Sequence, residues 1–498
     1  MRSLWIASLL ACVVFAPGLA RAGLNDVKVV TDTSIDCSSM ATIARDLWRD
    51  CKTDQDKAIA VWYFVRRMHF HWPHIPTWDS MDLINSYGFA LCGYQSTMYC
   101  QIAAAGGLKA RTMHLPGHVI AEAYYGGAWH MFDCQVGWYA LNRKGQVASC
   151  AEMKADPTLV SKAIEEGRAS KPYFQCRDDP KSGTNYAAKA RAGRTLKPPA
   201  KRLVINLRRG ESITRKWSNE GKSWHKPGET KWTQPGHTCT GQTIDANDPV
   251  NWPYWKPYAK VARVRNGKPV YGQKRYYGNG RMVYAPNLAT DHWADALVAA
   301  QTRNVEPAKG LRPVQAGQKA EAVFSFELPY VGVDAWLDAT VVRKADADAV
   351  AIHVKGAKGG WKKVWSAKKT GTLKLEKISL KDAAWFGHGY QIKFEMTAAK
   401  APADAAVSDL RVTSVFMNNM YALPFFKPGK NVVRVTAAKG ADLSANKLTL
   451  QYVWAEAGKD KTLEKTIDKA PFETTVQVAG PADGDLPRMK SVTLSVAP

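Results

Sequence analysis

The stretch Leu91-Cys-Gly-Tyr-Gln-Ser-Thr-Met-Tyr-Cys-Gln-Ile-Ala-Ala-Ala-Gly-Gly107 predicts a loop that leads into an amphipathic helix, which the two glycines end. Cys92 stands at the start of that helix. A free thiol with a pKa of ~8.5 is mostly protonated at neutral pH, and a helix N-terminus with a nearby imidazolium lowers that pKa. The position of Cys92 therefore predicts a reactive thiol.

Two later residues complete a candidate site. His118 lies 26 residues after Cys92, and Asp133 lies 15 residues beyond His118. The residues after His118 predict a strand, Gly126-Gly127 predicts a tight hairpin turn, and the returning strand ends at Asp133. The hairpin brings histidine and aspartate to one open end, where they supply a base and a group that orients it. Each residue alone suits a structural role, but the three in this register favour a catalytic triad.

The order and the flanking residues of this triad resemble the transglutaminase-like superfamily, whose core is that of a papain-type cysteine enzyme. The resemblance covers roughly residues 50–150 and includes Trp129 before the aspartate and Arg111 after the helix. The chain departs from the family at Cys134, where proline is common, and around Gly117 and Val119, where many members have His-Ala-Trp. Neither departure removes a catalytic atom.

The resemblance implies a mechanism and a set of roles. Cys92 attacks a carbonyl to form a thioester, His118 moves the protons, and Asp133 fixes the imidazole tautomer. The backbone N–H of Cys92, with a side chain of the preceding loop such as Asn85 or Tyr87, would stabilise the oxyanion. Gly93 would leave room for the substrate backbone. No metal or organic cofactor is implied, and amide hydrolysis is favoured over transamidation.

A helix is predicted from Thr53 to Phe70, and three histidines follow in His69-Phe-His71-Trp-Pro-His74. The proline and the lack of paired carboxylates or thiolates argue against a metal site. His71 is instead expected on a wall of the substrate cleft.

The N-terminus predicts export. Residues 1–22 form a signal peptide that ends in Ala20-Arg21-Ala22, and a lipoprotein anchor at Cys12 is the weaker alternative. No later apolar run reaches the ~18 residues that cross a bilayer. The cysteines suggest three bridges, with Cys100 left free. These bridges are Cys37–Cys51, Cys134–Cys150 and Cys176–Cys239.

Charge is distributed unevenly along the chain. Residues 23–180 carry 16 Lys and Arg against 17 Asp and Glu, whereas residues 181–280 carry 21 against 5. Basic residues interleaved with aromatic ones suit an acidic polymer, and predicted export favours a polysaccharide over nucleic acid. The candidate contacts are Arg208, Arg209, Trp217 and Trp224. The alternative is that the aromatics fill a β core and the charges only solvate the surface.

The predicted fold is α+β, with a papain-like transglutaminase core followed by mainly-β sandwich domains of jelly-roll and immunoglobulin-like type. The expected boundaries are 1–22 for the signal peptide, 23–180 for the catalytic domain, 181–315 for a basic, aromatic-rich β region, 316–428 for a galactose-binding-like sandwich and 429–498 for an immunoglobulin-like domain. The leading hypothesis is an exported thiol acyltransferase or amide hydrolase that acts on a protein, a peptide or another envelope polymer. One alternative is an enzyme that acts on an acidic polysaccharide or peptidoglycan through the same cleft; another is a non-catalytic glycan- or envelope-binding protein.

Overall fold

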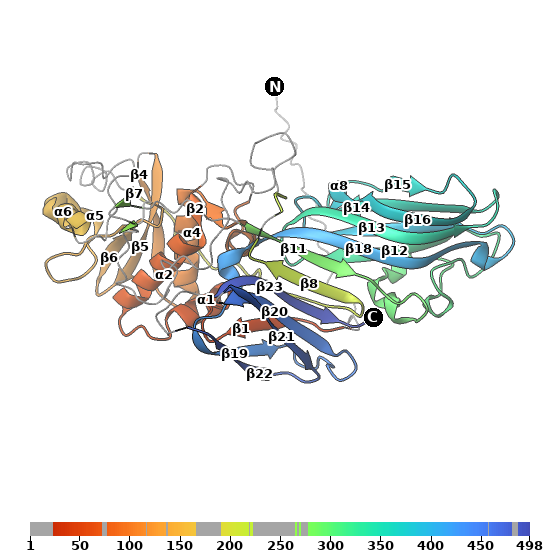
Figure 1. Cartoon of the computed structure of the whole chain (residues 1–498). Helices are drawn as coiled ribbons and strands as arrows, with labels where there is room; N and C mark the ends of the chain where they lie inside the picture. The colour runs from red at the N-terminus through yellow and green to blue at the C-terminus, as the bar shows by residue number, and fades with distance from the viewer. Residues whose placement is uncertain are drawn as a thin grey trace, which may run out of the picture.

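The computed structural model describes residues 23–71, 77–115, 117–135, 138–165, 191–218, 220–222, 264–265, 268–269, 277–456, 458–480 and 487–498. The chain is an α+β protein that is mostly β-sheet. A module of helices packed on a small sheet lies at one end of the molecule, and β-sandwiches form the rest (Figure 1). No helix in the described part of the chain is long and apolar enough to span a membrane.

Three helices form the inner layer of the N-terminal module: α1 (Met40–Leu47), α2 (Asp54–Met68) and α4 (Cys92–Ala105). Helix α2 begins at a capping box, in which Thr53 and Asp56 each bind the other's backbone N–H. Helix α4 ends at Gly106, where an added Cβ would lie 1.9 Å from the ring of Trp48. The helices predicted to start near Thr53 and at Cys92 are thus confirmed.

The sheet of this module has the order β6-β5-β4-β7 and packs against α4. Its strands are β4 (Ala110–Leu115), β5 (His118–Tyr125), β6 (Ala128–Phe132) and β7 (Arg191–Ala192). Gly126 and Gly127 connect β5 to β6 with φ values of 57° and 82°, which glycine adopts without strain. The predicted hairpin is confirmed.

Short elements surround these helices and this sheet. They are β2 (Phe70–His71), α3 (Ser80–Asp82), the π-helix η1 (Leu83–Tyr87), β3 (Phe89–Ala90), α5 (Cys150–Ala155) and α6 (Thr158–Glu165). Strands β2 and β3 pair in parallel just before α4 and help to fix the entry to that helix.

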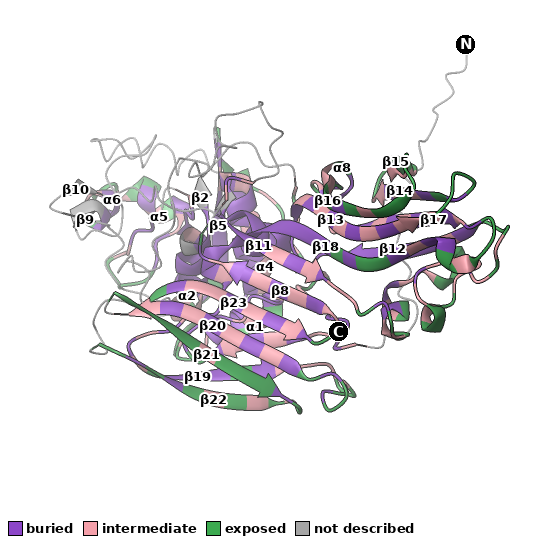
Figure 2. Ribbon diagram, turned by 45° about the vertical axis from the view of Figure 1, so that its right-hand side comes forward, coloured by how far each residue is buried: buried purple, intermediate pink, exposed green. Residues whose placement is uncertain are grey.

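One long sheet organises the C-terminal part, in the order β16-β13-β18-β11-β8-β23-β20-β21. Its strands are β8 (Glu211–Lys216), β11 (Tyr277–Tyr284), β13 (Gly332–Arg343), β16 (Gly371–Ser379), β18 (Ala405–Asn419), β20 (Leu448–Glu456), β21 (Lys459–Ile467) and β23 (Arg488–Val496). Burial alternates along β8 and β20 and along most of β13 and β23, which places one face of these strands in the core (Figure 2).

Two smaller sheets complete the β part (Figure 1). The four-stranded sheet β12-β17-β14-β15 consists of β12 (Ala320–Glu327), β14 (Ala349–Gly356), β15 (Lys362–Ser366) and β17 (Gly389–Thr397). The three-stranded sheet β1-β19-β22 consists of β1 (Lys28–Thr31), β19 (Gly429–Thr436) and β22 (Phe472–Val478). The remaining short elements are β9 (Val264–Arg265), β10 (Lys268–Pro269), η4 (His292–Ala296), η5 (Ala299–Gln301), η6 (Pro307–Lys309), α8 (Lys381–Ala384), η7 (Pro402–Asp404) and η8 (Met420–Ala422).

The boundaries expected between the β domains do not separate independent units. Strands β8 and β11, expected in a basic region of 181–315, are central strands of the long sheet, and β18 pairs with β11 across the expected boundary at 315/316. Strand β1, expected in the catalytic domain, pairs with β19 near the C-terminus. These pairings join segments far apart in the sequence, which local strand patterns do not reveal.

The expected disulfides are corrected by the structure. The cysteines at 37, 51, 92, 100, 134 and 150 are all free, and these are the ones within the described residues. The sulfur of Cys51 donates to the Leu47 carbonyl at 3.4 Å. Cys134 packs in the main core, whereas Cys150 belongs to a separate apolar cluster. The predicted bridges Cys37–Cys51 and Cys134–Cys150 are therefore absent, and Cys176–Cys239 lies outside the described residues.

Candidate active site

Cys92 is the first residue of α4, and its side chain is largely buried with 9 % exposed. Burial by itself raises the pKa of this thiol. The hydrogen bond and charge of His118, followed by the Val119 backbone N–H, outweigh burial and leave the pKa below its usual value. The structure therefore favours the thiolate of Cys92.

His118 is the first residue of β5 and is 7 % exposed. Its Nε2 lies 2.9 Å from Oδ2 of Asp133, so the remaining ring nitrogen, Nδ1, is the one left for Cys92. Burial lowers the pKa of the imidazole, but the charge and hydrogen bond of Asp133, and then those of Cys92, raise it from 6.5 to about 10. The lowered pKa of Cys92 and the raised pKa of His118 both act in favour of a thiolate paired with an imidazolium.

Asp133 is fully buried at the end of β6. Its Oδ1 accepts the backbone N–H of Gln135 at 3.0 Å, while its backbone exchanges hydrogen bonds with Trp138 at 3.1 and 3.2 Å. The indole Nε1 of Trp62, on α2, donates to the Asp133 carbonyl at 2.8 Å. The hydrogen bonds to the carboxylate and to the backbone of Asp133 thus hold its side chain toward His118. No local sequence signal marked the bond of Trp62 to the site.

The nucleophile helix is tied to the strand that carries the base. The hydroxyl of Ser96, one turn after Cys92, donates to the Val119 carbonyl at 2.9 Å. Since His118 precedes Val119, this bond fixes the start of β5 against α4. The first backbone N–H groups of α4 that find helical acceptors are those of Tyr94 and Gln95, which bind the Leu91 carbonyl.

At the start of α4, the backbone N–H groups of Cys92 and Gly93 therefore donate to no acceptor among the described residues. Asn85 does not supply a second oxyanion donor. Its Nδ2 already donates to the carbonyls of Cys37 and Met81, both at 3.0 Å. Tyr87 is fully buried, and burial raises the pKa of its phenol, followed by the charges of Asp82 and Asp79. The expectation for Asn85 is thereby corrected, whereas that for Tyr87 stays a prediction.

An exposed aromatic surface adjoins the nucleophile. Trp78 is 67 % exposed, and its ring stacks on Tyr94 with 3.9 Å between centroids. A Cβ built on Gly93 would lie 3.9 Å from both Trp78 and Val119, an ordinary contact, so glycine is not required there by crowding. The backbone next to Cys92 is therefore bordered by an indole face open to solvent, a feature that sequence analysis missed.

The histidine run does not form one surface. His69 is buried, and burial lowers the pKa of its imidazole to about 4, with hydrogen bonds to Leu83 and Val65 opposing. It is a neutral core residue. The side chain of His71 and the whole of His74 lie outside the described residues. Across the described ranges, no group of three His, Cys, Asp or Glu side chains is arranged to hold a metal ion.

The residues predicted to bind an acidic polymer occupy other roles. Arg208 is 4 % exposed and makes a bidentate pair with Glu211 at 2.7 and 3.1 Å, and Trp217 is also buried. Nε of Arg209 donates to Asn446 at 2.9 Å. Trp224 lies outside the described residues. Arg208 and Trp217 are therefore structural, which corrects that expectation; a buried cation requires a partner such as the carboxylate three residues on.

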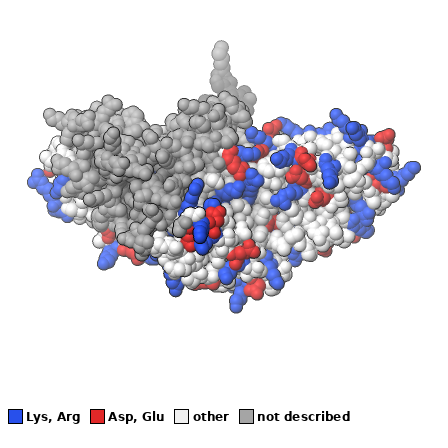
Figure 3. Space-filling view, in the orientation of Figure 1, with Lys and Arg blue, Asp and Glu red and all other residues white. Residues whose placement is uncertain are grey.

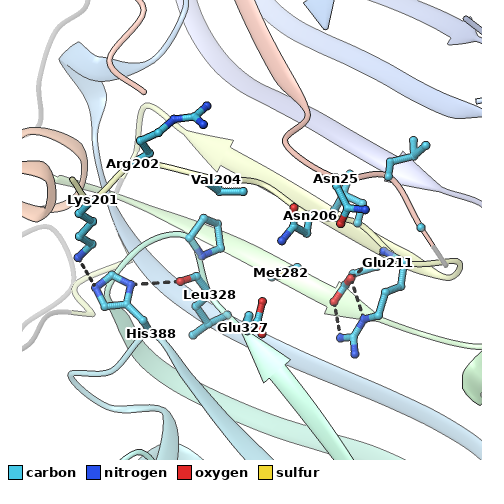
Figure 4. Close-up of a pocket in the computed structure, with 15 residues that line it drawn as sticks. Asn25, Lys201, Arg202, Val204, Asn206, Glu211, Met282, Glu327, Leu328 and His388 are labelled. Atoms are coloured by element: carbon cyan, nitrogen blue, oxygen red, sulfur yellow. Dashed lines mark hydrogen bonds and ion pairs between the residues drawn. The ribbon is translucent and has the colours of Figure 1, made fainter. Parts of the chain in front are cut away.

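A hollow of about 260 Å³, lined by both polar and apolar residues, lies beside the contact between the N-terminal module and the sheets (Figure 4). At one end of it, Lys201 pairs with Asp82 at 2.7 Å and with Asp79 at 3.0 Å, and His388 contacts Asp82 at 3.1 Å. Asp79 also caps α3 directly after Trp78. The cations are matched by carboxylates, so this junction holds the module against the sandwich.

No family model and no curated protein matches the chain. Among the solved structures that match it in part is an FMN-binding beta-glucuronidase from Facaelibacterium prausnitzii L2-6. The two chains are 13 % identical, the match covers 36 % of this chain and 29 % of that one, and the TM-score is 0.13. A similarity of this size supports no conclusion about fold or function.

Proposed function

We propose that this chain is a transglutaminase-like cysteine enzyme that transfers or hydrolyses acyl groups through Cys92, His118 and Asp133. One observation carries the proposal. The buried carboxylate of Asp133 lies 2.9 Å from Nε2 of His118, and the pKa values of His118 and Cys92 move in opposite directions. A thiol kept as a structural residue needs no such partner.

The geometry supports a stepwise acyl transfer. The Cys92 thiolate attacks the substrate carbonyl, and the N–H groups at the start of α4 are placed to stabilise the oxyanion. The imidazolium of His118 gives its proton to the leaving amine, and the thioester remains on Cys92. His118 then removes a proton from water or an acceptor amine, which attacks the thioester and releases Cys92. Hydrolysis is the favoured outcome.

The aromatic surface suggests where the acyl group binds. The open face of Trp78, supported by Tyr94, offers a flat apolar wall beside Cys92. An amide substrate with an apolar or ring-bearing group next to the scissile bond would bury that face. This feature favours catalysis over the non-catalytic alternative, because it adjoins the proposed nucleophile.

Export remains part of the proposal. It depends on residues 1–22, which lie outside the described residues, and the free cysteines give it no further support. An envelope or extracellular polymer is accordingly the proposed substrate class, with an acidic polysaccharide or peptidoglycan as the alternative.

A substrate panel tests the proposed function. Cell-wall peptides, proteins and anionic polysaccharides are incubated with the full chain and with Cys92→Ala, and released amine and new products are measured. We expect turnover of an amide substrate by the wild type alone. Equal turnover by Cys92→Ala would remove Cys92 from the chemistry.

A further inference from the structure

An open groove of about 540 Å³ lies between strands β15 and β16. Figure 1 places these strands in the part of the β-sandwich away from the N-terminal helices. Strand β15 forms one side and β16 the other. Each is the last strand of its sheet, β15 in the four-stranded sheet and β16 in the long one. The groove thus runs between two sheet edges and is unrelated to the residues around Cys92.

Four lysines surround this groove, and all four are exposed: Lys363, Lys368, Lys369 and Lys374. None of them forms an ion pair or a side-chain hydrogen bond with any residue in the described part of the chain. Residues 355–377 contain eight lysines and one acidic residue, Glu376, so this segment carries a strong positive charge. In Figure 3, Lys and Arg side chains are scattered, with Asp and Glu among them, over the end of the sandwich where Figure 1 labels β15.

The floor of the groove is apolar. Val364, Trp365, Leu373 and Leu375 line it between the lysines. Trp365 is partly buried and packs against the core, so its position is fixed while part of its surface stays open to the groove. An anchored indole beside flexible ammonium groups can contact a sugar ring while the lysines reach its acidic substituents.

We propose that the groove between β15 and β16 binds an anionic polysaccharide. Unpaired lysines at the lip of a hollow attract a polyanion, and the apolar floor gives contact area that a bare charged surface lacks. The groove lining contains lysine and no arginine. Ammonium groups pair with carboxylate, sulfate and phosphate alike, so the proposed export of the chain is what favours a polysaccharide over a nucleic acid. The site is independent of the proposed catalytic function.

Lysines on exposed edge strands also prevent edge-to-edge pairing between molecules. That role needs neither a hollow nor an apolar floor, and it predicts no preference among polyanions. The experiment separates it from binding.

The test measures binding of the full chain to polygalacturonate, heparin, neutral dextran and a single-stranded oligonucleotide, by affinity gel electrophoresis at low salt and near physiological salt. The groove variant changes the four groove lysines to Gln. A matched control changes four exposed lysines elsewhere that form no ion pair with the described residues to Gln, which removes the same charge: Lys439, Lys447, Lys461 and Lys465.

We expect the wild type and the control to bind an acidic polysaccharide, and the groove variant to bind it about 10-fold or more weakly. Binding should weaken with salt, and less steeply in the groove variant. In the wild type, bound polymer should protect the groove lysines from acetylation as mapped by mass spectrometry. The proposal would be overturned by an absence of binding, by an equal loss of binding in both variants, or by acetylation of the groove lysines that the polymer does not change. Prevention of edge-to-edge pairing would then remain as the role of these lysines. Tighter binding of the oligonucleotide than of either acidic polysaccharide would overturn the ligand class.

Discussion

Replacing Asp133 by Asn should move the ring proton of His118, the proposed base, from one ring nitrogen to the other. Oδ1 of Asp133 accepts the Gln135 N–H, so an Asn side chain that keeps this bond turns its NH₂ group toward Nε2 of His118. Nε2 must then accept a hydrogen bond, which places the ring proton on Nδ1, the nitrogen left for Cys92. A histidine in this tautomer cannot take the thiol proton.

The size of the effect follows from the charges at the site. The pKa of His118 is raised from 6.5 to about 10, and Asp133 provides the largest contributions that raise it against burial. That difference corresponds to roughly 5 kcal/mol in favour of the imidazolium at ~1.4 kcal/mol per unit. Asn removes the charge, so the imidazolium is lost and the pKa of Cys92 rises. We expect a loss on the order of 10³–10⁴ in turnover.

The assay is the rate of iodoacetamide alkylation at Cys92 as a function of pH, followed by peptide mapping. At pH 6, Asp133→Asn should react at least about tenfold more slowly than wild type, since one pKa unit corresponds to that factor. Asp156→Asn, at a partly buried residue that pairs with Arg143, is the control and should match wild type. An unchanged pH profile in the folded Asp133→Asn protein would refute the role of Asp133.

Three further outcomes are expected. At pH 6–7, iodoacetamide should label Cys92 before Cys51, because burial, followed by the charges of nearby aspartates, raises the pKa of Cys51 to about 11; faster labelling of Cys51 in peptide maps would contradict the nucleophile assignment. Trp78→Ala should raise KM several-fold and change kcat little, whereas a fall in kcat alone would exclude a role in substrate binding. Arg208→Met should destabilise the fold by about 3–5 kcal/mol in urea unfolding by leaving Glu211 unpaired, and Arg208→Met with Glu211→Leu should recover most of that loss.

Local signals predicted several elements of the N-terminal module. The start of α4 at Cys92, the Thr53 cap of α2 and the turn at Gly126 and Gly127 each depend on a few neighbouring residues. A hairpin with a fixed turn also determines which ends of its strands meet. The proximity of His118 and Asp133 could therefore be deduced without tertiary information.

Long-range pairing explains what the sequence did not reveal. The long sheet joins β8, β11, β18 and β23, whose order in space no local pattern encodes. The sequence shows Glu211 three residues after Arg208, so an ion pair between them could be predicted. The burial of Arg208 could not, because it depends on contacts with the distant residues Tyr284 and Ser325. The sequence also shows the lysines of residues 355–377. That four of them border one groove follows only from the structure, in which β15 and β16 are edge strands of two different sheets.

Trapping of an acyl-enzyme tests the central claim most directly. The full chain is mixed with an amide substrate from the panel, quenched in acid during turnover, and examined by intact-mass and peptide-mapping mass spectrometry. The account predicts an acyl adduct on Cys92 that hydroxylamine removes, as expected for a thioester, and that is absent from Cys92→Ala. Turnover with no adduct on Cys92 and with full activity in Cys92→Ala would contradict it.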